Sequence, residues 1–240
     1  MTDCEKKDLD VDSKRVGFET SVNTKSLKKA GRIQLPEHTG IFKLHLEAKQ
    51  QTLNCREDLR EGVKLPLGVA EDDWIHAKII GVYEELDMVI SLVLDFCKED
   101  TCTRMCAGKH TSYCWACEEQ PTPLEMPAKQ YMTTLSEYAN KILRNQDYFP
   151  ADGQKDQQDP KEFKSVVKKL LKRFFRVYAH TYLHHFEDIR EYDCVAHVNC
   201  SFKHFLYFVR EFDLVTLDDM APLRGLVSEF LKDGENRTDS

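Results

Sequence analysis

The chain has 240 residues, of which 41% are hydrophobic, 10% aromatic and 31% charged. This composition is that of an ordinary globular protein, and it excludes a disordered, collagen-like or low-complexity chain. The formal net charge is −7, from 34 basic and 41 acidic residues, which disfavours general binding to DNA or to anionic membranes. At about 150 residues per domain, the length predicts one large domain, or one domain with tails, and not two full domains.

Hydropathy and cysteine content indicate the cellular compartment. The stretch richest in aliphatic residues, Val89–Leu94, is too short to span a bilayer, and the charged start of the chain lacks the apolar stretch of a signal peptide. We therefore expect a soluble intracellular protein in the cytoplasm, with the nucleus and the cell cortex as further locations. In that compartment we do not expect the nine cysteines to form a disulfide framework, so they are buried thiols or metal ligands.

The first 40 residues are rich in Lys, Asp, Ser and Thr and show little apolar periodicity, so we predict a flexible tail over 1–40. Thr24 and Ser26, on either side of Lys25, are candidate phosphorylation sites, and the alternative is a solvated tail without a regulatory role. A helical domain is predicted over 41–232, followed by a disordered C-terminal tail over 233–240.

Within the domain, apolar residues recur at helical spacing, and the segment 97–128 interrupts them with five cysteines, a glycine and three prolines. In that segment Ser112–Glu118 is predicted as a short strand or hairpin. Thr216 and Asp219 have the spacing of a capping box, which predicts the start of the last helix. The repeated period of 3.6 residues predicts a mainly α-helical fold. Helices are predicted over 41–53, 71–93, 131–142, 161–186, 202–212 and after Thr216, with a loop over 146–160.

Cysteines and histidines form a candidate metal site. Five thiols lie within 97–117, and a second group of ligands, His180, His184 and His185, lies far downstream. Zinc takes four nitrogen or sulfur ligands in a tetrahedron, so Cys97, Cys102 and two of these histidines would tie a loop to a helix. On a straight helix, residues four apart differ by about 40° and residues five apart by about 140°, which by itself favours His180 with His184. Two alternatives remain, buried thiols without metal and a local four-thiolate set of Cys102, Cys106, Cys114 and Cys117.

A zinc ion at such a site is expected to be structural. The sequence contains no HExxH motif, and a fully ligated ion offers no open position to a water molecule. The motifs of phosphate loops, dinucleotide-binding folds and serine hydrolases are absent as well. A zinc-dependent hydrolase and a nucleic-acid-binding zinc module nevertheless stay open as alternatives at this point.

The segment from Lys161 to His180 is strongly basic, with seven Lys and Arg residues against the single acid Glu162. At about 100° per residue, five of the cations fall on one face of a helix. Two arginines and a lysine in this group have no acid one turn away, so they can bind a phosphate group through charge-assisted hydrogen bonds. The alternative is a solvated amphipathic face. The five cations that share one face of the predicted helix are Lys168, Lys169, Lys172, Arg173 and Arg176.

The opposite charge is concentrated earlier in the chain, where residues 57–73 carry six acids against two bases. Asp72, Asp73 and Trp74 lie at the end of this segment and could receive a basic helix of a partner, with the tryptophan as an apolar anchor. Equally, Trp74 can be a core residue whose indole N–H is satisfied internally.

Several segments together resemble a known family. The motifs that carry the resemblance are Asp73-Trp74-Ile75, Phe96-Cys97-x4-Cys102, Met105, Ala107-Gly108, Tyr113, Trp115, Tyr148-Phe149-Pro150, Lys172-Arg173-x-Phe175-Arg176-Val177-Tyr178-Ala179-His180-x4-His185-Phe186, Ala196-His197-Val198-Asn199-x-Ser201-Phe202-Lys203-His204-Phe205, Phe208-Val209-x-Glu211-Phe212 and Ala221-Pro222-Leu223. They cover roughly residues 42–230 and resemble the Mob (Mps-one-binder, phocein-like) family of kinase-activating adaptors.

The resemblance implies a compact helical fold around a four-helix core, with a structural zinc ion. Its ligands carry over to Cys97, Cys102, His180 and His185, in place of the His184 that helix geometry favours, which implies that the helix ends or distorts near His185. It also implies a non-enzymatic adaptor in Hippo/NDR-type signalling. Such adaptors bind the N-terminal region of NDR/LATS-type AGC kinases through an acidic surface, here Asp72, Asp73 and Trp74. They bind phosphothreonine motifs of upstream Ste20-like kinases or scaffolds through cations that match Lys172, Arg173 and Arg176.

The chain also departs from the family pattern. An Asp seven residues after the Trp in activating members is Gly81 here, which removes a charge from the kinase-binding surface and places a poor helix former there. A lysine-rich segment of the family is replaced by Glu118-Glu119-Gln120, and Cys106, Cys114 and Cys117 are additional. The metal and phosphate sites are therefore better supported than the kinase surface, and the sequence predicts a divergent member.

Overall fold

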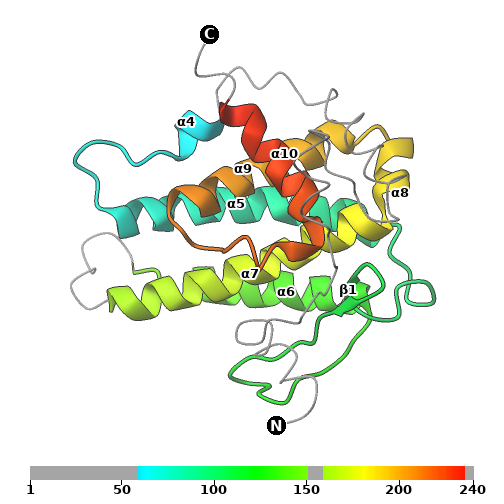
Figure 1. Cartoon of the computed structure of the whole chain (residues 1–240). Helices are drawn as coiled ribbons and strands as arrows, with labels where there is room; N and C mark the ends of the chain where they lie inside the picture. The colour runs from blue at the N-terminus through cyan, green and yellow to red at the C-terminus, as the bar shows by residue number, and fades with distance from the viewer. Residues whose placement is uncertain (1–58, 151–158, 236–240) are drawn as a thin grey trace, which may run out of the picture.

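The computed structural model describes residues 59–150 and 159–235 (Figure 1). The predicted tail over 1–40, the predicted helix over 41–53, and most of the tail over 233–240 lie outside the described residues, although the last helix continues to Glu235. In chain order the elements are α4 (Leu59–Val63), α5 (Glu71–Leu94), β1 (Cys106–Ala107), β2 (Thr111–Ser112), α6 (Ala128–Leu143), α7 (Pro160–His184), α8 (Phe186–Glu191), α9 (Val195–Glu211), the 3-10 helix η3 (Ala221–Leu223) and α10 (Arg224–Glu235).

Four long helices, α5, α6, α7 and α9, form the body of the molecule, and α5 packs against the other three (Figure 1). Helices α4 and α10 pack against α9. The prediction of a mainly α-helical fold is therefore confirmed. Among the described residues, no helix combines the length and the apolar character that crossing a bilayer would require.

Local sequence explains where the two helices nearest the candidate site begin. The first turn of α5 carries Glu71, Asp72 and Asp73, and acidic side chains stabilise the positive end of the helix dipole. The first turn of α7 is capped by Asp159, whose carboxylate accepts a hydrogen bond from the backbone N–H of Lys161 at 2.9 Å. Pro160 follows the cap at the first helical position, where its missing N–H costs nothing.

The core is built from aromatic side chains contributed by α7 and α9. The rings of Tyr178 and Phe202 lie 4.8 Å apart, and those of Tyr178 and Phe205 lie 5.3 Å apart. The buried hydroxyl of Tyr178 hydrogen-bonds the hydroxyl of Ser201 at 2.7 Å, which satisfies both polar groups away from water. This packing fixes the middle of α7, the helix that carries both the histidines and the basic residues.

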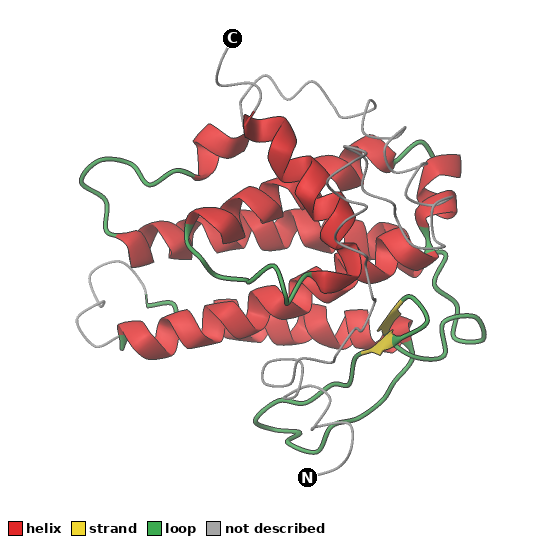
Figure 2. Cartoon of the chain, in the orientation of Figure 1, coloured by secondary structure: helices red, strands yellow, loops and turns green. Residues whose placement is uncertain are grey.

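A small antiparallel hairpin is present, but it lies earlier in the chain than the predicted segment Ser112–Glu118. Cys106 pairs with Ser112 and Ala107 with Thr111, and β1 packs against α7 (Figure 2). The turn contains Gly108 at a φ of 71°, a left-handed conformation that glycine adopts without strain. The position of this glycine therefore decides where the chain reverses. Further along, only an isolated bridge joins Trp115 and Leu124.

The predicted capping box forms, but it does not begin an α-helix. The backbone N–H of Asp219 donates to the Thr216 hydroxyl at 3.2 Å, and the N–H of Thr216 donates to the Asp219 carboxylate at 3.0 Å. These bonds close a turn that η3 follows, and α10 begins only at Arg224. Pro222 has no N–H to donate to the Asp218 carbonyl, so an α-helical ladder cannot continue through this point.

Candidate functional site

The four predicted metal ligands come from two places in the fold. Cys97 and Cys102 lie in the loop after α5, where their backbone N–H groups donate to the carbonyls of Val93 and Lys98, each at 2.8 Å. His180 lies in the last turns of α7. The two backbone hydrogen bonds of the cysteines each span four residues, as in a helical turn. They keep the loop compact, so both thiols lie against the end of α7.

The structure brings these four side chains together in the interior. Cys97 Sγ lies 3.5 Å from His180 Nε2, and Cys102 Sγ lies 3.4 Å from His185 Nε2. All four ligand atoms lie within 4.8 Å of one another, and all four residues are buried. The donor atoms of a tetrahedral zinc ion lie about 3.3–3.8 Å apart for ordinary Zn–S and Zn–N bonds, so the two Cys–His distances fit a metal ion.

The end of α7 explains why His185 joins the group. The helix ends at His184, and His185 has φ −124° and ψ 16°, outside the helical range. Its side chain therefore does not follow the spacing of a straight helix, and the preference for His184 that this spacing suggested is wrong for the group that contains Cys97 and Cys102. The expected end of the helix near His185 is confirmed.

Both histidines of the group have an oxygen partner on the other ring nitrogen. His180 Nδ1 lies 2.8 Å from the backbone carbonyl oxygen of Cys106, and His185 Nδ1 lies 2.9 Å from the carboxylate of Asp188. Because an oxygen acceptor requires a proton on Nδ1, both rings are oriented with Nε2 facing a thiol. Metal-binding histidines are held by partners of this kind, which fix the tautomer and the ring orientation.

Burial controls the protonation of the group. Desolvation, together with the neighbouring thiol of Cys102, raises the pKa of Cys97 above its usual range. Burial lowers the pKa of His180 to about 3, against the opposing hydrogen bond to Cys106 and with His184 and His185 nearby. Without a metal ion, the Cys97 thiol therefore keeps its proton and the His180 imidazole is neutral. A tetrahedral set of two sulfur and two nitrogen donors is typical of zinc sites.

His184 and Cys106 stand beside this group. Cys106 Sγ lies 3.4 Å from His184 Nε2, which also accepts a hydrogen bond from the backbone N–H of Gly108 at 3.1 Å. Sequence reasoning left Cys106 without a role, and its contact appears only because the hairpin packs on α7. In the part of the chain that the structure describes, the alternative four-thiolate set of Cys102, Cys106, Cys114 and Cys117 is not brought together.

The three predicted phosphate-binding residues lie side by side on α7, half-buried. Lys172 forms an ion pair with Asp219 at 3.0 Å. Arg173 lies over the ring of Trp115, 4.4 Å from its centroid, and donates to the carbonyl oxygen of Ala116. The other terminal nitrogen of Arg173, Nη1, is buried without a hydrogen-bond partner. Stacking on an indole ring orients a guanidinium, so the free N–H groups have a fixed direction.

Arg176 is held by the same segment. Its Nη1 donates to the Tyr131 hydroxyl at 3.0 Å, and its guanidinium lies 4.9 Å from the centroid of the Tyr113 ring. The segment from Tyr113 to Ala116 therefore supports both arginines through rings and carbonyl groups. Sequence reasoning identified the cations from their charge but missed these aromatic supports, because they lie about 60 residues away in the chain.

The predicted kinase-binding residues lie in the first turn of α5. Trp74 is half-buried, and its indole N–H donates to the carbonyl of Val63 at 2.9 Å. The carboxylate of Asp72 lies 3.5 Å from Nζ of Lys164 on α7, so the acidic turn is partly neutralised within the chain. Further along α5, a Cβ atom built on Gly81 would meet no described atom within 4 Å apart from its chain neighbours and the backbone of its own helix, so the position is open to a side chain.

Comparison with known proteins defines the class of this chain. Residues 50–223 match the model of the Mob1/phocein family, and the chain belongs to that family. Among its relatives, MOB kinase activator-like 3 of Drosophila melanogaster is 34% identical over 193 residues, which cover 80% of this chain and 86% of the relative. MOB kinase activator 3B of Mus musculus is 35% identical over 191 residues (79% and 87%), and MOB kinase activator 3A of Bos taurus is 36% identical over 193 residues (79% and 87%).

Proposed function

We propose that this protein is a non-catalytic adaptor that binds and co-activates an NDR/LATS-type AGC protein kinase in the cytoplasm, and that it docks a phosphothreonine motif of an upstream Ste20-like kinase or scaffold. The observation that carries the proposal is the cluster of Lys172, Arg173 and Arg176 on α7, in a chain of the Mob1/phocein family whose relatives are named kinase activators. Membership of the family supports a regulatory role and not a catalytic one.

The phosphate group is assigned to the basic cluster on chemical grounds. Arg173 has a buried terminal nitrogen without a partner, and its ring stacking holds it in place. Arg176 lies one turn further along the same helix. Two arginines and a lysine can bind three phosphate oxygens through charge-assisted hydrogen bonds, which are stronger than those between neutral groups. In the described residues the Asp219 carboxylate forms an ion pair with Lys172, so a bound phosphate would displace this carboxylate.

Zinc is proposed as a structural ion at Cys97, Cys102, His180 and His185. The four buried ligands fit the size and softness of zinc, and the ion would supply a cross-link between the loop after α5 and the end of α7. Four protein ligands complete a tetrahedron and leave no position for water, so this arrangement supports a structural ion and argues against the zinc-dependent hydrolase.

The kinase would meet the first turns of α5. Asp72, Asp73 and Trp74 lie there together and are half-buried, which suits a basic segment of the partner that brings charge and apolar surface to the same place. Because Gly81 stands where activating members have an Asp, we propose that docking of the kinase is weaker than in those members.

Titration of two peptides tests the phosphate assignment. A phosphothreonine peptide from a candidate upstream kinase should bind the full chain at least tenfold more tightly than its unphosphorylated twin, since the phosphate adds charge-assisted hydrogen bonds. Arg173→Ala and Arg176→Ala should each remove most of that difference, whereas Lys232→Ala on the remote helix α10 should leave it unchanged. Equal binding of both peptides would exclude the phosphate site. Activation of NDR/LATS kinases by the chain then tests the adaptor role.

A further inference from the structure

A row of lysines extends from the proposed phosphate site toward the start of α7. The residues line a surface groove of about 480 Å³, and none of the described residues that line it is acidic. The only acid in this half of the helix, Glu162, does not line it. The lining residues are Lys161, Lys164, Ser165, Lys168, Lys169 and Lys172.

Helix geometry makes this a narrow row. At about 100° per residue, Lys161, Lys168 and Lys172 fall within about 40° of one another around the axis of α7. At about 1.5 Å per residue, the row from Lys161 to Lys172 is about 16 Å long. A cation therefore stands on nearly every turn of one side of the helix, with the hydroxyl of Ser165 between them.

Three of the charges in the row are not neutralised within the described residues. Lys164 pairs with Glu71 and Asp72 at 2.8 and 3.5 Å, and Lys172 pairs with Asp219 at 3.0 Å. The side chains of Lys161, Lys168 and Lys169 have no ion pair in the same part of the chain. Lys168 and Lys169 thus lie between the two places where α7 contacts acidic residues, and Lys161 lies one turn before the first of them.

We infer that this row binds an acidic segment flanking the phosphothreonine of the docked partner. The inference rests on the proposed function and extends it, because Lys172 belongs both to the phosphate site and to the row. An extended peptide advances about 3.3 Å per residue, so about five residues span the 16 Å of the row. Alternate side chains of such a peptide point the same way about every 6.6 Å, close to the helical pitch of about 5.4 Å, so two or three carboxylates can each meet a lysine.

A peptide fits this row better than a membrane or a nucleic acid does. Glu71 and Asp72 border the groove at Lys164, and Asp219 borders it at Lys172. A broad anionic surface would meet these carboxylates along with the lysines, on a chain whose net charge is −7. A single extended strand covers only the row itself and avoids the acids on either side.

Fluorescence anisotropy with the full chain tests the inference. The probes are three phosphothreonine peptides, with Glu at alternate positions on the N-terminal flank, with Glu on the C-terminal flank, or with Gln on both. One acidic flank should tighten binding about three- to thirtyfold over the Gln peptide, since each exposed ion pair adds only a modest gain, and high salt should reduce the effect. The triple variant K161Q/K168Q/K169Q should bind all three peptides alike. The control K98Q/K109Q/K129Q, which removes three exposed lysines elsewhere, should keep the gain.

The outcomes separate this inference from the function on which it rests. A triple variant that keeps the wild-type preference for the acidic flank would overturn the lysine row, even if Arg173→Ala still abolished binding of every phosphopeptide. A triple variant that weakens all three peptides equally would also overturn it, because the lysines would then act only as a general field. Stronger lysine-dependent binding to phosphatidylserine vesicles or duplex DNA than to the acidic peptide would replace the peptide with that ligand. If the wild-type chain bound the phosphothreonine peptide no more tightly than its unphosphorylated twin, the proposed function itself would be refuted.

Discussion

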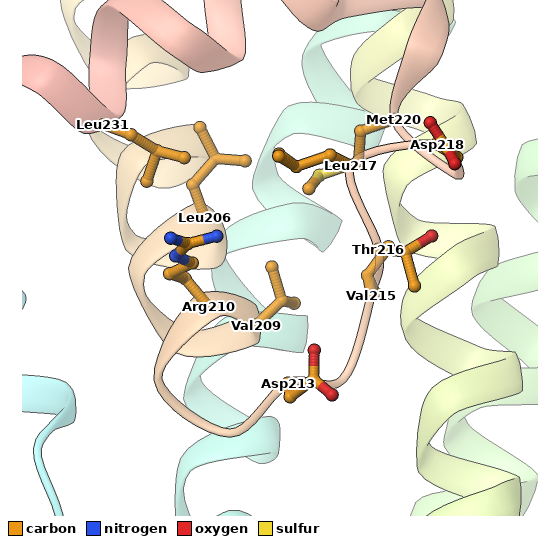
Figure 3. Close-up of a pocket in the computed structure, with 10 residues that line it drawn as sticks. All are labelled: Leu206, Val209, Arg210, Asp213, Val215, Thr216, Leu217, Asp218, Met220 and Leu231. Atoms are coloured by element: carbon orange, nitrogen blue, oxygen red, sulfur yellow. The ribbon is translucent and has the colours of Figure 1, made fainter.

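The carboxylate of Asp219 lies 3.0 Å from Nζ of Lys172, and this ion pair joins the loop after α9 to the basic face of α7. Thr216 holds the carboxylate from the other side, since its hydroxyl donates to Asp219 at 2.7 Å. The same loop lines a cavity of about 510 Å³ against Leu206, Arg210 and Leu231 (Figure 3). Asp219 thus pairs with a lysine that the proposed phosphate group would bind. The pair also connects the proposed phosphate site to the loop beside the cavity.

Replacing Asp219 by Asn should tighten phosphopeptide binding about two- to fivefold, because the amide does not compete for Lys172 as a carboxylate does. Isothermal titration of the phosphothreonine peptide measures the change. Asp218→Asn is the matched control, since the side chain of Asp218 is 89% exposed and pairs instead with Arg224 at 2.7 Å. Weaker binding by the Asp219 variant would show that this carboxylate supports the site and does not block it.

The same ion pair predicts a pH dependence. Burial acts to raise the pKa of Asp219, but hydrogen bonds from Thr216 and Lys172 outweigh it, and the pKa lies below its usual value. Because the folded-state pKa is below that of the unfolded chain, ionised Asp219 adds stability above about pH 3.9, and this is lost as the pH falls through the folded-state pKa. Urea denaturation should therefore show wild type more stable than Asp219→Asn at pH 6, with the difference shrinking below about pH 4. A difference that grew on acidification would contradict this.

Removing the metal should destabilise the protein strongly. The proposed structural zinc would tie the loop after α5 to α7, so chelation should lower the melting temperature by on the order of 10 °C or more. Metal analysis should find one zinc per chain in wild type and almost none in His185→Ala or Cys102→Ser. His184→Ala is the matched control, because His184 lies one residue away but outside the four-ligand group, and it should keep its zinc. Loss of zinc in that variant alone would reassign the ligand.

Gly81 offers a gain in stability and a test of the kinase surface. A glycine inside a helix costs about 0.5–1 kcal/mol relative to alanine. Because the added Cβ meets no described atom within 4 Å outside the adjacent backbone, Gly81→Ala should stabilise the fold by about that amount. Chemical denaturation checks this. Gly81→Asp should strengthen binding to an NDR/LATS N-terminal segment relative to the neutral Gly81→Asn. Equal affinities of the Asp and Asn variants would mean that this position lies outside the interface.

The long helices could be predicted from sequence because each carries its own apolar period. Helices α5, α6 and α7 lie close to the predicted ranges, and their ends follow local signals such as the Asp159 cap of α7. Helix α9 is predicted in the right place, but it begins at Val195, seven residues before the predicted start. The predicted hairpin position is wrong, since strands of two residues have no period to detect and their position depends on Gly108 and on packing against α7. The hydrogen bonds of the capping box are confirmed, but the α-helix expected after them does not form, because Pro222 stops the helical ladder.

By itself, the sequence determined the chemistry available to this protein. It contained the ligand types Cys97, Cys102 and the histidines, and the density of cations on α7. Only the tertiary structure decided which of these groups act together. His185 reaches the thiols because α7 ends one residue before it. Among the described residues, Lys172 has an ion pair and Lys168 has none, because Asp219 returns to α7 from a distant loop. Ligand identity is a property of single residues, whereas direction and pairing depend on backbone turns and on contacts between segments far apart in the chain.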